Sequence, residues 1–149
     1  MRSSTDTPLR ALGRGLAAGA AGTAAMTAAQ TAYYKATGAE GSTLPADVAK
    51  RVIRGVLQRE VSDERTEMLN TAMHWFYGVG WGALYGLAVR RPTHGIAFSA
   101  VVWGASLVEL PAMKLGPPPW QMPPASIPPD LGFHLVYGVA VAQAHRALA

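Results

Sequence analysis

The sequence predicts an all-α integral membrane protein, a four-helix bundle built from two related helical hairpins, with one interfacial amphipathic helix. Three observations predict this class. Four long runs are apolar and almost free of charge, and the charged residues gather between them. The motif His-x-x-Tyr-Gly-Val occurs at 74–79 and again at 134–139, each time early in an apolar run. The repeated motif indicates that the two hairpins are related.

The composition limits the possible classes. The 149 residues suit a single domain, 1–149, in which 50% of the residues are hydrophobic and 15% are charged. The net charge is +4, but Lys and Arg are spread over segment ends and one loop, so no nucleic-acid binding is expected. The absence of cysteine excludes disulfides and thiolate chemistry. Without a phosphate loop or a nucleophile elbow, the chain is expected to be non-enzymatic.

The apolar runs cover residues 12–34, 70–89, 95–113 and 131–148. Each is close to the about 20 residues that cross a bilayer core as a helix. The first run is rich in Ala, Gly and Thr and follows a basic segment, so a signal peptide is an alternative interpretation of it. A soluble helical bundle is the general alternative. It requires charged outer faces, which these runs lack.

Two segments between the apolar runs have distinctive sequence patterns. Residues 45–61 are predicted to form an amphipathic helix, because Pro45 and Asp47 suit a first turn and the apolar and basic residues separate onto two faces. Such a helix could lie on the membrane surface, or it could fold over the loop without touching lipid. Residues 116–129, GPPPWQMPPASIPP, are expected to form a stiff polyproline-like loop with neither helix nor strand.

Basic residues in the short connectors predict the orientation. With four spans, they all lie on one side, which is the cytoplasmic side by the positive-inside rule. We therefore expect a multi-pass protein of the bacterial cytoplasmic (inner) membrane with both termini in the cytoplasm. The opposite side also carries basic residues, most of them in the long loop after the first span. The residues that set the orientation are Arg2, Arg10, Arg14, Arg90, Arg91 and Arg146.

This topology places one strongly polar side chain from every span at the same depth. Spans two and four run inward and carry their His near the start, while spans one and three run outward and carry their polar residue near the end. All four lie roughly 6 Å below the outer boundary at a rise of about 1.5 Å per residue. Polar side chains at this depth must face one another or water. The predicted layer is Gln30, His74, Glu109 and His134, with Tyr77 and Tyr137 on the two His faces.

Glycines accompany the layer. A glycine follows each motif His at i+4 and removes bulk beside the imidazole, where a helix, a file of water or a flat ligand could approach. Gly82 and Gly86 extend the stripe of the second span, a pattern that favours close helix packing and could also support a homo-oligomer. The glycines to which we assign close packing are Gly78, Gly82, Gly86 and Gly138.

The third and fourth spans resemble a known family. The stretch GIAFSAVVWGASLVELPAMKLGPPPW, the proline-rich loop and GFHLVYGV, together with HWFYGVGWGALYGL, look like the YagU-like family of bacterial inner-membrane proteins. The resemblance covers about 70–146 and implies a small polytopic protein without an established activity, in a family linked in part to acid tolerance. His74, His134 and 110–120 match the family pattern, whereas Glu109 does not belong to it.

Four interpretations of the polar layer remain open. It could be structural, fixing helix register in an assembly protein, or it could handle protons or a small solute near the outer face. It could bind a divalent metal through His74, Glu109 and His134. It could hold a b-type haem between His74 and His134 as a redox protein. No cofactor motif is present, so no cofactor is predicted. The structural interpretation carries the most weight, and among the interpretations that give the layer an activity, proton or small-solute handling in a lipid bilayer is favoured.

Overall fold

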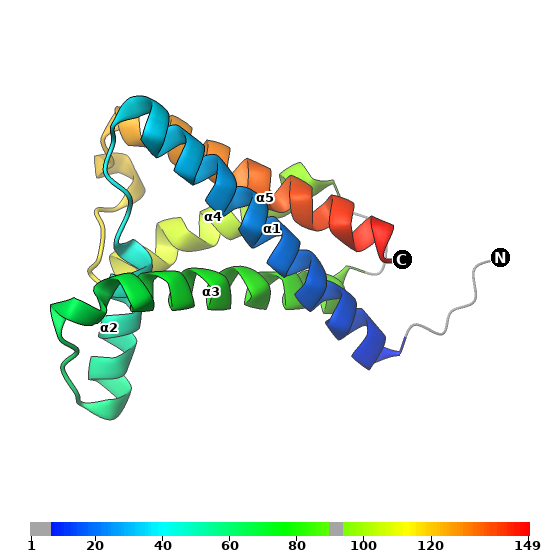
Figure 1. The fold of residues 1–149 in the computed structure, drawn as a ribbon, viewed down its shortest axis with the longest axis horizontal. Coiled ribbons are helices and arrows are strands. Elements are labelled where there is room, and N and C mark those ends of the chain that lie inside the picture. The colour runs from blue at the N-terminus through cyan, green and yellow to red at the C-terminus, as the bar shows by residue number, and fades with distance from the viewer. Residues whose placement is uncertain (1–6, 90–93) are drawn as a thin grey trace.

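Figure 1 shows the computed structural model, which describes residues 7–89 and 94–149. Within these ranges the chain forms five α-helices and no strand, so the predicted all-α class is confirmed. The long helices are α1 (Pro8–Thr37), α3 (Thr66–Ala88), α4 (Gly95–Ala112) and α5 (Ile127–Ala147), and the short one is α2 (Leu44–Leu57). Single 3-10 turns lie at η1 (Asp63–Arg65), η2 (Pro119–Gln121) and η3 (Pro124–Ser126).

The four long helices run in alternating directions along the molecule (Figure 1). α1 packs against both α3 and α5, and α4 packs against α5. α1 and α4 run toward the end that carries α2 and the 3-10 turns, which we call the loop end and which comprises residues 38–65 and 113–126. α1 begins and α5 ends at the opposite end (Figure 1). Of the residues that set the predicted orientation, Arg2, Arg90 and Arg91 lie outside the described ranges.

The ends of the long helices follow from local chemistry. α1 begins earlier than predicted because the Thr7 hydroxyl accepts a hydrogen bond from the Arg10 amide at 3.3 Å, and it ends at Gly38, whose φ of 70° suits glycine. α5 begins at Ile127, because Pro128 and Pro129 occupy a first turn that needs no backbone donors. The prediction that 116–129 contains no helix is therefore wrong for its last three residues and for the two 3-10 turns.

α2 is shorter than the predicted helix 45–61. It ends at Leu57, because Gln58 adopts a left-handed conformation with φ 50° and its amide donates to the Arg54 carbonyl at 3.1 Å. Ala46 and Ala49 are buried where α2 packs on α3. Val52 and Val56 are 44% and 74% exposed, so the apolar face of α2 extends beyond its contact with α3.

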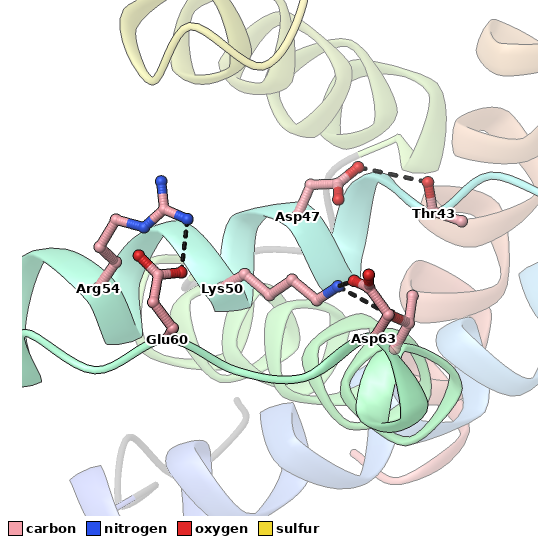
Figure 2. A network of polar contacts seen from close by, with 7 residues as sticks. Thr43, Asp47, Lys50, Arg54, Glu60 and Asp63 are labelled. Atoms are coloured by element: carbon pink, nitrogen blue, oxygen red, sulfur yellow. Dashed lines mark hydrogen bonds and ion pairs between the residues drawn. The ribbon is translucent and has the colours of Figure 1, made fainter.

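Ion pairs hold the segment after α2 against the basic face of that helix (Figure 2). The Lys50 ammonium donates to Asp63 Oδ1 at 2.8 Å, and the Arg54 guanidinium donates to Glu60 Oε2 at 2.6 Å. The hydrogen bond and the positive charge of Lys50 hold the pKa of Asp63 below its usual range. The basic face that the sequence predicts thus has acidic partners within the same loop.

The core lies among the four long helices, and α1 contributes Ala18 to it. Tyr85 packs edge-on to Phe98 with ring centroids 4.7 Å apart, and its other side contacts His145 at 5.1 Å. Tyr137, Val141 and Val102 complete the buried centre. Many large apolar side chains lie instead on the outer surface of the long helices, among them Leu16, Phe76, Leu84, Ile96, Val101 and Val108.

Among the described residues, one helix has both the length and the mean hydropathy of a membrane span. It is α4, Gly95–Ala112, with a mean hydropathy of 1.5 and 22% of its residues buried inside the protein.

Candidate functional site: an interhelical polar layer

Glycines bring α1 and α3 into backbone contact. A Cβ atom on Gly19 would lie 2.9 Å from Gly82 Cα, and one on Gly15 would lie 2.5 Å from the Gly82 carbonyl oxygen. A Cβ on Gly86 would collide with the backbone of α1 in the same way. Such distances leave no room for any side chain. The glycine stripe of α3 is therefore used inside the chain, and the predicted homo-oligomer would need another surface.

The second hairpin repeats this arrangement. A Cβ on Gly138 would collide with Ser99 Oγ, just as a Cβ on Gly78 would collide with Thr23 Oγ1. The Thr23 hydroxyl donates to the carbonyl oxygen of the residue four positions before it at 2.8 Å, and so does the Ser99 hydroxyl. In both cases that residue is a glycine, Gly19 or Gly95. The repeat therefore extends from the motif to the helix before it, as expected for two related hairpins.

The same contacts determine what lies beside the motif glycines. Of the three expected occupants, a helix, a file of water or a flat ligand, it is a helix that packs there, α1 at Gly78 and α4 at Gly138. Thr23 and Ser99 fill the space that a haem held by the two imidazoles would need.

His74 bonds to α1. Its Nε2 lies 3.2 Å from Thr27 Oγ1, and the Thr27 hydroxyl donates its only proton to the Thr23 carbonyl at 2.8 Å. The hydroxyl oxygen can therefore only accept from His74, so Nε2 carries the proton and Nδ1 is the unprotonated nitrogen. Nothing in the sequence pairs Thr27 with His74.

His134 belongs to a cluster that includes two residues outside the predicted layer. Its Nδ1 lies 2.8 Å from the Asp130 carbonyl oxygen and 3.5 Å from Asp130 Oδ1. The other carboxylate oxygen, Oδ2, accepts a hydrogen bond of 2.8 Å from Trp103 Nε1 on α4. A carbonyl oxygen can only accept, so Nδ1 carries the proton and Nε2 is unprotonated. The sequence analysis assigned neither Trp103 nor Asp130 to the polar layer.

The two motif tyrosines make different contacts. Tyr77 donates to Glu109 Oε2 at 2.7 Å and so joins α3 to α4 near the exposed rim of the bundle. Tyr137 is 2% exposed and donates to the Gly78 carbonyl oxygen at 2.6 Å, which joins α5 to α3 through the centre. Glu109, which we expected to reach either imidazole, is bonded to Tyr77 instead.

The structure therefore brings only some members of the predicted layer together. His74 and His134 lie close enough for a charge on one to act on the other, although each has its own hydrogen-bond partner. Gln30 is half-buried and makes no side-chain hydrogen bond with the described residues. Within residues 7–89 and 94–149, no three His, Asp or Glu side chains are grouped as metal ligands, and His74, Glu109 and His134 form no such group.

The layer nevertheless concentrates titratable groups in the half of the bundle nearest the loop end. Two imidazoles and two carboxylates come from α3, α4 and α5, and each makes a hydrogen bond to a neighbouring group. Every fully buried side-chain nitrogen and oxygen in the described part of the chain has a hydrogen-bond partner. Chemically, the arrangement can bind and release protons, and it can tie the helices together.

Comparisons with protein-family models, with curated proteins and with solved structures found no match.

Proposed function

We propose that this chain is a small, non-enzymatic, four-span protein of the bacterial inner membrane, as its resemblance to the YagU-like family implies. One observation carries the membrane part: buried and half-buried polar side chains bond across the long helices, while many large apolar side chains of the same helices are exposed. Tyr137 is 2% exposed, whereas Phe76 is 75% exposed. An exposed apolar belt around paired polar groups favours lipid as the surrounding solvent.

In this proposal α2 lies along the membrane surface at the outer side. Figure 1 supports this placement, because α2 projects sideways from the loop end instead of continuing along the bundle. At 14 residues α2 is too short to span a bilayer. The exposed Val52 and Val56 would enter the boundary between headgroups and acyl chains.

The proposed topology is tested by cysteine labelling, since the chain has no cysteine of its own. Single cysteines at Ser42 and Ser126, both at the loop end, are expected to react with an impermeant thiol reagent in intact cells. Cysteines at Ser4 and Thr93, which lie outside the described residues, are expected to react only after the membrane is opened. Labelling of the Ser4 or Thr93 variant in intact cells would contradict the four-span topology.

The proposed activity is the uptake of protons, or of another small polar solute, by the polar layer from the outer side. The support is chemical. Two imidazoles that can influence each other's charge lie in one layer with two carboxylates, and His is the side chain that changes charge near neutral pH.

Proton handling is tested in vesicles that contain the purified chain and an internal pH-sensitive dye. We expect proton entry well above that of protein-free vesicles. We expect the double variant His74→Ala/His134→Ala to lose most of it, because both side chains of the layer that change charge near neutral pH are then absent. Glu40→Gln, a carboxylate in the loop after α1, is the matched control and is expected to retain the rate. Entry equal to that of empty vesicles would contradict proton passage.

A structural role is the second candidate, and the hydrogen bonds favour it. Bonds between side chains or from a side chain to the backbone join α1 to α3, α3 to α4, α4 to α5 and α5 to α3. Such a set fixes the rotation and the register of all four helices even if no proton moves. In membranes each bond contributes about 0.6 kcal/mol on average, so several are needed for this purpose.

A further inference from the structure

The repeat differs at the position four residues before each motif histidine. The first half carries Asn70 there and the second half carries Asp130. The Asn70 amide serves α2: its Oδ1 accepts from the Ala46 amide at 3.1 Å, and its Nδ2 donates to the Ser42 carbonyl at 3.1 Å. The Asp130 carboxylate faces Trp103 and His134 instead. Equivalent positions therefore perform different tasks in the two halves.

The proton positions on the two imidazoles also differ. His134 carries its proton on Nδ1, so a further proton must bind at Nε2. His74 carries its proton on Nε2, so a further proton must bind at Nδ1. Neither step breaks a bond within the protein, since the proton adds to a nitrogen lone pair and leaves an imidazolium. What distinguishes the two sites is the charge that surrounds the imidazolium.

Only the His134 imidazolium would have a counter-ion beside it. Asp130 Oδ1 lies 3.5 Å from Nδ1, and Trp103 holds the carboxylate in place from α4. The hydrogen-bond partner of His74, Thr27, is neutral, and so is Asn70 at the position equivalent to Asp130. An opposite charge at this distance favours the charged form of a titratable group, and burial without one disfavours it.

The remaining charges around His134 do not offset this difference. α1 carries no charged residue between Arg14 and Lys35. From α4 the one charged group is Glu109, which is bonded to Tyr77. From α3 the titratable group that acts on His134 is His74, and a charge on one imidazole would oppose a charge on the other.

We infer that the Asp130–His134 pair is the proton-binding site of the polar layer, and that His74 is its neutral, hydrogen-bonding counterpart. The inference rests on the proposed function and names the residues that perform it. Asp130 is 40% exposed and lies at the first turn of α5, next to the loop end, while the His134 side chain is 13% exposed. Asp130 is thus placed to hold a negative charge beside the Nδ1 side of the imidazolium that forms when a proton binds at Nε2. Asn70, at the equivalent position of the first half, instead bonds to Ala46 at the start of α2 and to Ser42 before it.

Imidazole NMR signals of the full chain in detergent micelles test this inference. Single variants His74→Gln and His134→Gln assign the two signals, and a pH titration follows them. We expect His134 to bind its proton first as the pH falls. We expect Asp130→Asn to lower the midpoint of His134 by about one pH unit or more, because an opposite charge at this distance is worth about 1–3 units. Glu40→Gln, which removes a carboxylate in the loop after α1 and outside the polar layer, is the control and is expected to leave that midpoint unchanged.

Protonation of His74 before His134 in the unaltered chain would overturn the inference, and this measurement needs no variant of Asp130 to fold. An equal midpoint of His134 in the Asp130→Asn and Glu40→Gln variants would also overturn it. The titration is independent of proton passage across vesicles. A site that titrates as expected in a chain that passes no protons would leave the inference standing and contradict the proposed function alone.

Discussion

Gly82→Ala is expected to destabilise the folded chain by about 3 kcal/mol, the upper part of the range for forcing extra atoms into a packed interior. The added methyl group would collide with Gly19 Cα and would lie 2.6 Å from the Gly15 carbonyl oxygen. These neighbours are backbone atoms, so no side chain can turn away to make room. α1 and α3 must separate along their whole contact, which also pulls Thr27 away from His74.

Gly80→Ala is the matched control for this substitution. Gly80 lies on the same helix two residues earlier, and a Cβ there meets nothing within 4 Å. Alanine at that position is expected to leave stability unchanged or to raise it by up to about 1 kcal/mol, because glycine is the poorer helix former. Unfolding in detergent micelles followed by circular dichroism measures both variants. If the two variants unfolded alike, the glycine stripe would not be a packing surface.

Much of the fold could be predicted because it depends on patterns within single helices. Four apolar runs separated by charged or proline-containing segments gave the four long helices within a few residues of their ends. The predicted ends of α2 and α5 were less accurate. α2 stops where Gln58 turns left-handed, and α5 starts inside the proline-rich segment. Both depend on local backbone geometry that residue type only weakly specifies.

The site was harder to predict because hydrogen bonds between helices depend on how each helix is rotated. The depth of His74 and His134 could be inferred from residue counting, but their partners could not. Glu109 has the right depth to meet an imidazole, yet its rotation around α4 places it beside Tyr77. A signal for Asp130 was present in the sequence, since each motif histidine follows Asn or Asp by four residues. The signal was missed because Asp130 directly follows the proline-rich segment 116–129, which was predicted to be a loop.

Tyr137→Ala is expected to cost about 3–4 kcal/mol of folding stability, close to the usual loss for a buried aromatic residue. Tyr137 is the side chain by which α5 touches all three other long helices. Its ring would lie 3.0 Å from a Cβ on Gly22 of α1, its centroid is 5.9 Å from that of Phe98 on α4, and its hydroxyl bonds to Gly78 on α3. Its removal opens a cavity at the point where the four helices meet.

Tyr77 occupies the equivalent position of the first motif and is the natural comparison. Its ring is half-buried and its hydroxyl bonds to the exposed Glu109, so Tyr77→Ala is expected to cost about 1–2 kcal/mol, in the middle of the range for substitutions. Tyr137→Phe, which keeps the ring, should lose only about 1 kcal/mol for the hydrogen bond. The same unfolding measurement in micelles gives all three values. Equal losses for Tyr77→Ala and Tyr137→Ala would mean that the two halves of the repeat still contribute alike. A stability loss for Tyr137→Ala that exceeds the loss for Tyr77→Ala by at least about 1 kcal/mol means that the two equivalent tyrosines contribute differently. Tyr137 then stabilises the centre of the bundle, and Tyr77 lies at its rim.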